Sequence, residues 1–201
     1  MRTLFVALLI LFAACGVDNN PNVGQSMQPL ADMNDQMAYM TTLMQSHCPS
    51  GATSNKFYIN SNGGLASPYA HYTDDANIFA NGPGIGRRDR IDVNINARDA
   101  SWWWGLTFSN AVVNGQLLPI VPGFYDNATD FSAPPATSHP VFSVSGNGQG
   151  SSASLAYVYV ETVVWTNFDA LTTFKMAFVQ RSTNGTMQWG FVCFDRLPPA
   201  P

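Results

Sequence analysis

Hydrophobic and polar side chains alternate with a period of two along most of the second half of the chain. A strand turns successive side chains to opposite faces, so this period predicts strands and not helices. Four runs carry it: Trp102, Trp104, Leu106 and Phe108; Ala156, Val158, Val160, Thr162 and Val164; Thr172, Phe174, Met176 and Phe178; Met187, Trp189, Phe191 and Cys193. Asn184-Gly185 joins the last two runs, and Asn-Gly between alternating runs is the strongest short-range hairpin signal.

The chain before these runs also favours strands and turns. Segments 56–60, 77–80 and 90–98 are predicted strands. In the last of them Ile91, Val93, Ile95 and Ala97 share one face, and Asp92, Asn94, Asn96 and Arg98 share the other. A half-buried antiparallel strand has this pattern. The sequence therefore predicts an all-β fold, an antiparallel β-sandwich.

One segment, 33–47, has the period of a helix. Asp32 is placed to cap its first turn and Pro49 lies just past its end. Leu30, Met33, Met37, Met40 and Met44 recur at three- and four-residue spacing, which gives the helix one apolar face. We expect a single N-terminal amphipathic helix that packs on the sandwich.

The N-terminus has the features of an export signal. Met1-Arg2 precedes the apolar run 4–12, which is shorter than the roughly 20 residues that cross a bilayer. The segment Phe12-Ala13-Ala14-Cys15-Gly16 then resembles the lipobox of bacterial lipoproteins. That resemblance implies cleavage before Cys15, acylation of Cys15 and, because Gly16 is not aspartate, transfer to an outer membrane where the host has one. The alternative is an ordinary signal peptide cut near Ala14.

These signals divide the chain into three parts. Residues 1–14 are the predicted signal peptide, and 15–28, rich in Asn and poor in apolar residues, are a flexible tether. Residues 29–201 are the predicted single sandwich domain with its helix. Once Cys15 is acylated, Cys48 and Cys193 are the remaining thiols, and outside the cytoplasm we expect them to form a disulfide.

The charged residues argue against two classes of function. The net charge is −4, and the basic cluster Arg87, Arg88 and Arg90 is interleaved with Asp89 and Asp92, so we expect no nucleic-acid partner. The sequence has one glutamate, Glu161, and no GxSxG motif, whereas glycosidases need two carboxylates. Histidines 47, 71 and 139 lack metal-binding spacing. We therefore predict no catalytic residue, no cofactor and no enzyme activity.

The second half of the chain resembles a group of secreted, mostly uncharacterised bacterial proteins. Trp104-Gly105-Leu106-Thr107-Phe108, Pro122 to Thr129, Val144 to Gly150 and Phe178-Val179-Gln180 match that group's pattern in order and spacing, over about 57–195. The resemblance implies an extracellular β-sandwich and carries no catalytic residue. Asp130 replaces an arginine, and Ser151 and Ser182 replace two cysteines. Their joint absence implies that Ser151 faces Ser182 across a hairpin of 153–165 and 171–181.

Three functions follow as alternatives. The first is a structural or interaction role at the cell envelope, with the membrane reached through a lipid anchor and an envelope protein as partner. The second is glycan binding on a platform of exposed aromatic rings, for which Trp103, Trp189, Tyr69 and Tyr72 are the candidates. The third is periplasmic copper binding by Met37, Met40, Met44 and His47, because thioether sulfur is a soft ligand.

Overall fold

The computed structural model describes residues 32–49, 55–61, 69–73, 76–84, 87–97, 102–129, 139–146, 149–150, 153–182 and 185–196. The predicted signal peptide, Cys15, the predicted tether, Asp130 and Ser151 lie outside these ranges. The described elements are α1 (Met33–His47), β1 (Lys56–Ser61), β2 (Tyr69–Thr73), β3 (Ala76–Asn81), β4 (Arg90–Ala97), β5 (Trp103–Ser109), β6 (Val112–Val113), β7 (Gln116–Leu117), β8 (Gly123–Ala128), β9 (Val141–Gly146), β10 (Gln149–Gly150), β11 (Ala153–Trp165), β12 (Leu171–Ser182) and β13 (Met187–Asp195).

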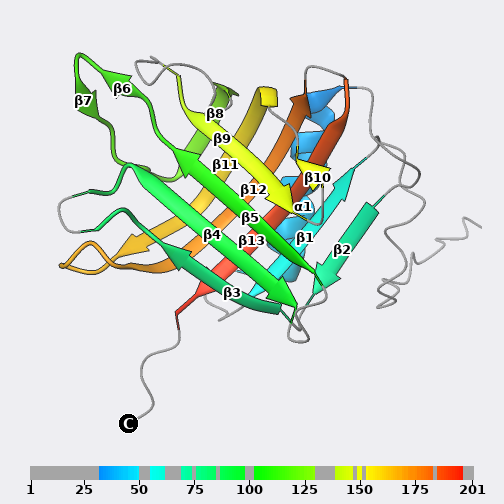
Figure 1. The fold of residues 1–201 in the computed structure, drawn as a ribbon, viewed down its shortest axis with the longest axis horizontal. Coiled ribbons are helices and arrows are strands. Elements are labelled where there is room, and N and C mark those ends of the chain that lie inside the picture. Colours follow the sequence, from blue (N-terminus) through cyan, green and yellow to red (C-terminus); the bar gives the residue numbers. More distant parts are fainter. Residues whose placement is uncertain are drawn as a thin grey trace, which may run out of the picture.

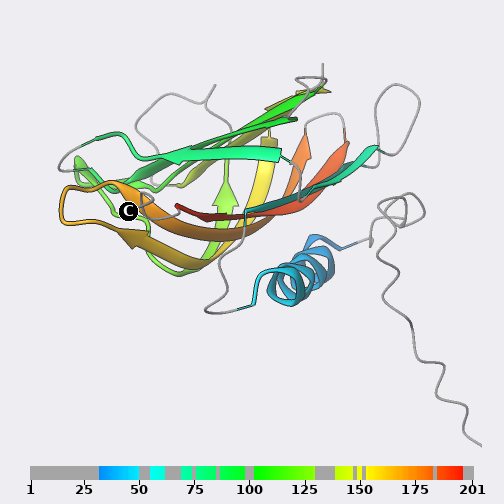
Figure 2. The same ribbon diagram turned by 90° about the horizontal axis from the view of Figure 1, so that it is seen from below.

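Two antiparallel sheets form the predicted sandwich. One has six strands in the order β2-β1-β13-β12-β11-β8, and the other has five in the order β10-β9-β5-β4-β3. Figure 1 looks onto the five-stranded sheet, and the small β6–β7 hairpin extends beside it. Figure 2 shows the two sheets as stacked layers, with α1 on the far side of the six-stranded sheet. The all-β prediction with one helix is confirmed.

The main core lies between the two sheets. Every second residue of the facing strands is buried there, for example Ile91, Val93 and Ile95 of β4 against Phe174, Met176 and Phe178 of β12. Burial of large apolar side chains contributes about 1.5–3 kcal/mol each, and it fixes which face of each strand points inward. The opposite side chains of β4 and β5 therefore point away from the core.

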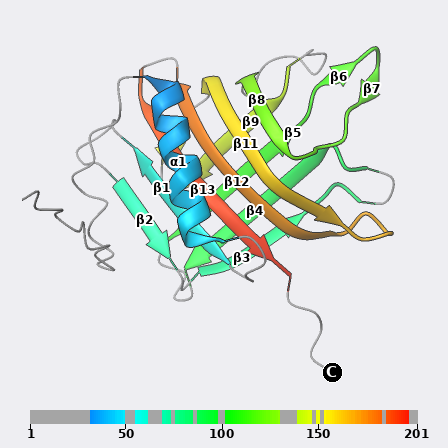
Figure 3. The ribbon, with the colours of Figure 1, turned by 180° about the vertical axis from the view of Figure 1, so that it is seen from behind.

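A second core holds α1 against the outer face of the six-stranded sheet. Figure 3 shows the helix lying along this face, and it contacts β11, β12 and β13. The helix has the predicted bounds, and the carboxylate of Asp32 caps it by accepting a hydrogen bond from the backbone N–H of Asn34 at 2.7 Å. Among the described residues, no helix is both long and apolar enough to cross a membrane.

The long hairpin of β11 and β12 is also confirmed, with one correction to its register. The chain turns between Thr166 and Ala170, where Asp169 takes a positive φ of 58° as a turn residue. The residue opposite Ser182 is Ala153, not Ser151. Irregularities along β11, including a bulge between Val160 and Thr162, shift the pairing away from the symmetric register that the paired serines implied.

Candidate functional site

The two outer faces of the sandwich differ in what covers them. Helix α1 packs on the six-stranded sheet, whereas no described helix lies on the five-stranded sheet (Figure 2). We call the second surface the open face. Its described side chains come from β3, β4, β5 and β9: Phe79, Asn81, Asp92, Asn94, Asn96, Trp103, Thr107, Ser143 and Ser145, around Gly105.

The strand register aligns these residues in rows across the sheet. Phe79 pairs with Asn94, Asn94 with Gly105, and Gly105 with Ser145. One such row therefore crosses four strands. Neighbouring strands lie about 4.8 Å apart, so residues of β3 and β5 in the same row are separated by about 10 Å.

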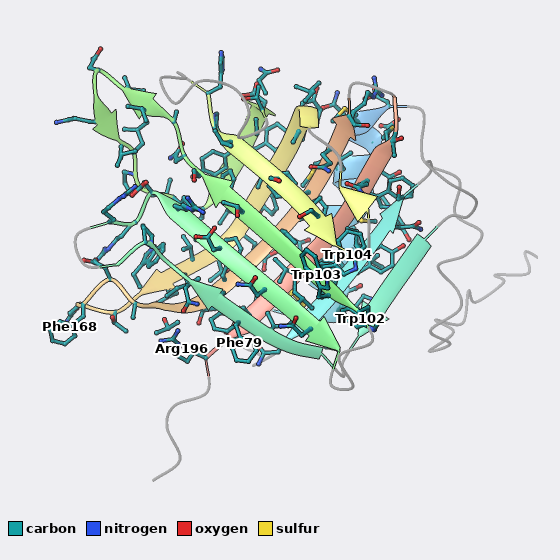
Figure 4. The ribbon with its side chains drawn as sticks, in the orientation of Figure 1. Phe79, Trp102, Trp103, Trp104, Phe168 and Arg196 are labelled. Atoms are coloured by element: carbon teal, nitrogen blue, oxygen red, sulfur yellow. A yellow bond between two sulfur atoms is a disulfide. The ribbon has the colours of Figure 1, made fainter. Side chains whose placement is uncertain are left out.

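Trp103 lies beside Gly105 on the same face of β5. A carbon placed at the Cβ position of Gly105 would lie 3.7 Å from Cζ3 of Trp103, so one edge of the indole lies close to the glycine. The side chain is 52% exposed, and Phe79 is 56% exposed. Figure 4 shows both residues, on β5 and β3. The open face thus presents two aromatic rings to solvent.

The charged groups of the open face are paired. Asp92 accepts hydrogen bonds from Arg90 at 2.8–3.0 Å and from the hydroxyl of Thr107 at 2.8 Å. Around them are amides and hydroxyls, and Asn94 is exposed. Within the described part of the chain, the face is therefore polar without an uncompensated charge.

The aromatic platform predicted from the sequence does not form as one surface. Trp189 is 1% exposed, because it lies on the outer face of β13 beneath α1, and this prediction is wrong. Tyr69 and Tyr72 belong to β2 at the edge of the other sheet, and their side chains lie outside the described residues. Trp103 is the one predicted platform residue that the structure places on the open face.

Phe79 was not among the predicted platform residues, although a signal for it was present. It lies between Ile78 and Ala80, which are both buried. In a strand, the residue between two inward positions points outward. The two-residue period of the strand therefore predicts that Phe79 is exposed on the surface.

The methionine stripe is part of the second core. Met37, Met40 and Met44 are at most 4% exposed and pack with Tyr58, Ala177, Trp189 and Phe191. His47 stacks on Phe191, with ring centroids 5.9 Å apart. The described residues contain no group of three or more His, Cys, Asp or Glu side chains arranged to hold a metal ion. This arrangement supports the packing role of the stripe, and copper binding stays a prediction.

The second core also contains the predicted disulfide, and a buried lysine lies beside it. Cys48 and Cys193 are bonded, with Cα atoms 6.6 Å apart, which confirms the predicted pair. Lys175 is buried, and its ammonium donates hydrogen bonds to the carbonyl oxygens of Cys48 and Pro49 at 3.2 and 3.0 Å. A cation there is also stabilised by the negative, C-terminal end of the helix dipole.

Burial raises the pKa of the Tyr58 phenol, and hydrogen bonds with Asn60 and Trp189 partly offset that rise.

A shallow cavity of about 260 Å³ lies near the start of β4, away from Trp103. It is lined by Arg87, Arg88, Asp89, Leu117, Pro119 and Asp169. Its arginines already form salt bridges, Arg87 with Asp89 at 2.8 Å and Arg88 with Asp169.

Glu161, the single glutamate, lies at the β11 bulge, and one of its carboxylate oxygens is buried without a hydrogen-bond partner in the described structure. The structure does not place it among the cavity-lining residues.

Comparison of the chain with protein-family models, with curated proteins and with solved structures finds no match.

Proposed function

We propose that the protein is a lipid-anchored cell-envelope protein that acts by binding a partner on its open face, without catalysis. The observation that carries this proposal is the asymmetry of the sandwich. On one outer face α1 covers β11, β12 and β13 and leaves Phe124 exposed on the edge strand β8. On the other outer face, which no described helix covers, Trp103 and Phe79 are exposed. Exposed aromatic residues on a polar surface are typical of binding sites.

The chemical character of the open face supports binding over catalysis. Catalytic pairs need titratable groups that are free to exchange protons. Here the carboxylate of Asp92 is occupied by Arg90 and Thr107, and its neighbours are amides and hydroxyls. Such groups orient a ligand by hydrogen bonds and leave it chemically unchanged.

The lipobox resemblance at the N-terminus supports the lipid anchor. The lipobox resemblance ends at Cys15, and the described fold begins at Asp32 with α1. The described chain begins at α1, on the opposite side of the sandwich from the open face (Figure 2). Outer-membrane localisation is part of this proposal.

Metabolic labelling tests the anchor. Radiolabelled palmitate should enter the wild-type protein and not the Cys15→Ala variant, because the acyl group is attached to the sulfur of Cys15. The Trp103→Ala variant is the matched control and should be labelled like the wild type, since the open face has no part in acylation. Equal labelling of Cys15→Ala and wild type would contradict the proposal.

A further inference from the structure

The two exposed rings of the open face lie in neighbouring cross-strand rows. Phe79 begins the row that continues through Asn94 to Gly105, and Trp103 lies in the next row, opposite Asn96, with Cζ3 of its indole close to Gly105. Asn94 therefore lies between the two rings. Its side chain is exposed and makes no hydrogen bond within the described structure.

This order of groups matches the surface of a sugar chain. A pyranose ring has an apolar C–H face that stacks on an aromatic ring, and hydroxyls at its edge that pair with amides. An asparagine amide offers both two donors and an acceptor, as neighbouring sugar hydroxyls require. The rows on either side supply Asn96 and Thr107, which add polar groups at the rim of the stacking surface.

The length and charge of the row narrow the ligand class. Phe79 and Trp103 come from strands two positions apart, about 10 Å by ordinary strand spacing, which exceeds a single sugar ring. The charged residues on this face, Arg90 and Asp92, neutralise each other. This pair carries no net charge, which suits a neutral polymer.

We infer that the open face binds a neutral oligosaccharide chain laid across β3, β4 and β5, stacked on Trp103 and Phe79 and hydrogen-bonded to Asn94. This inference rests on the proposed function, since it names the partner class of the same face. The sugar chain lies on a surface and not in a cleft, so it is bound along its length and its ends are free.

Affinity electrophoresis of the detergent-solubilised mature protein tests the inference. The probes are a neutral β-linked glucan, a neutral galactomannan and an acidic polygalacturonate, each cast into a native gel. At least one neutral polymer should retard the wild type, and added salt should not reduce the effect, because no net charge is involved. Trp103→Ala should weaken retardation at least about tenfold, as removal of a central aromatic anchor does. Phe79→Ala and Asn94→Ala should weaken it less.

Phe168→Ala is the matched control. Phe168 is 78% exposed at the turn between β11 and β12, far from Trp103 in Figure 4. The substitution therefore removes an exposed ring that lies away from Phe79, Asn94 and Trp103. It should bind like the wild type. The inference is overturned if Trp103→Ala and Phe79→Ala bind like the wild type, if only the polygalacturonate is bound, or if no neutral polymer is bound.

A second measurement separates this inference from the proposed function. Wild-type and Trp103→Ala proteins are incubated with detergent-insoluble envelope material of the host, pretreated with periodate or with protease. Retention that depends on Trp103 and is lost after periodate supports the sugar ligand. If it is lost after protease and survives periodate, the partner is a protein, and only the present inference fails. Retention that is absent, or that ignores Trp103, would contradict the proposed function as well.

Discussion

Gly190 occupies a position in β13 where the neighbouring strands leave no room for a side chain. A Cβ atom there would overlap the carbonyl oxygen of Tyr58 and lie 2.9 Å from Cζ of Phe178. The glycine is required by this close approach and not by an unusual backbone angle. It allows β1 to approach β13 closely in the same sheet and the ring of Phe178 to lie against Gly190.

We expect Gly190→Ala to lower the free energy of unfolding by about 1–3 kcal/mol, because an overpacked core must shift backbone or ring atoms. Urea denaturation measures the change. Gly105→Ala is the control in the other sheet, where the nearest atoms are 3.7 and 3.9 Å away and a methyl group fits. Equal losses in the two variants would show that the crowding at Gly190 is not the cause.

Single residues also show where sequence reasoning stops. Alternation places Trp103 and Trp189 on strands and gives the face of each, but it does not tell which face another element covers. Trp189 is buried because α1, 140 or more residues earlier in the chain, packs over it. Trp103 stays exposed because no described helix covers the outer face of the five-stranded sheet. The burial of both is a tertiary effect.

Among the elements, those with clear periodicity were predictable. Helix α1 has its predicted limits, and the strands with buried alternate residues, such as β4 and β11, lie where the pattern indicates. In strand β8 only Ala128 is buried, so the strand carries no regular alternation of buried and exposed residues. It exists because its backbone pairs with the edge of β11. Edge strands of this kind depend on a partner that the local sequence does not reveal.

The attachment of α1 can be tested through its central methionine. Met40 is fully buried, so Met40→Ala should lower the free energy of unfolding by about 2–5 kcal/mol, through lost contacts and a cavity. Met40→Leu should lower it by less than about 1.5 kcal/mol, since volume is kept. Urea denaturation measures both, and Thr42→Ala on the exposed side of the helix serves as control.

The same pair of variants tests the copper prediction. Both remove the thioether sulfur, whereas only Met40→Ala removes the packing. If the stripe holds Cu(I), titration with Cu(I) should show weaker binding in both variants. Equal stability of Met40→Ala and wild type would contradict the packing role of Met40.

For the whole molecule, the disulfide is a covalent link of long reach, because it joins residues 145 positions apart. Replacing both cysteines in Cys48→Ser/Cys193→Ser should lower the free energy of unfolding by about 5 kcal/mol if the stabilisation comes from the restricted unfolded chain. Urea denaturation with and without reductant measures it. Reductant should destabilise the wild type to the level of the double variant and leave the variant unchanged. A wild type that ignores reductant under denaturing conditions would contradict the bond.

The position of that bond also decides how the protein responds to tension. Cys48 directly follows α1, and Cys193 lies in β13, an interior strand of the six-stranded sheet. A pull on the N-terminal end can peel α1 from the sheet, but beyond Cys48 the load passes through the covalent bond into β13. The segment between the two cysteines, which includes the whole open face, is bypassed and cannot be drawn out as extended chain while the bond is intact. Tension applied between the two ends of the chain would thus leave the binding surface folded.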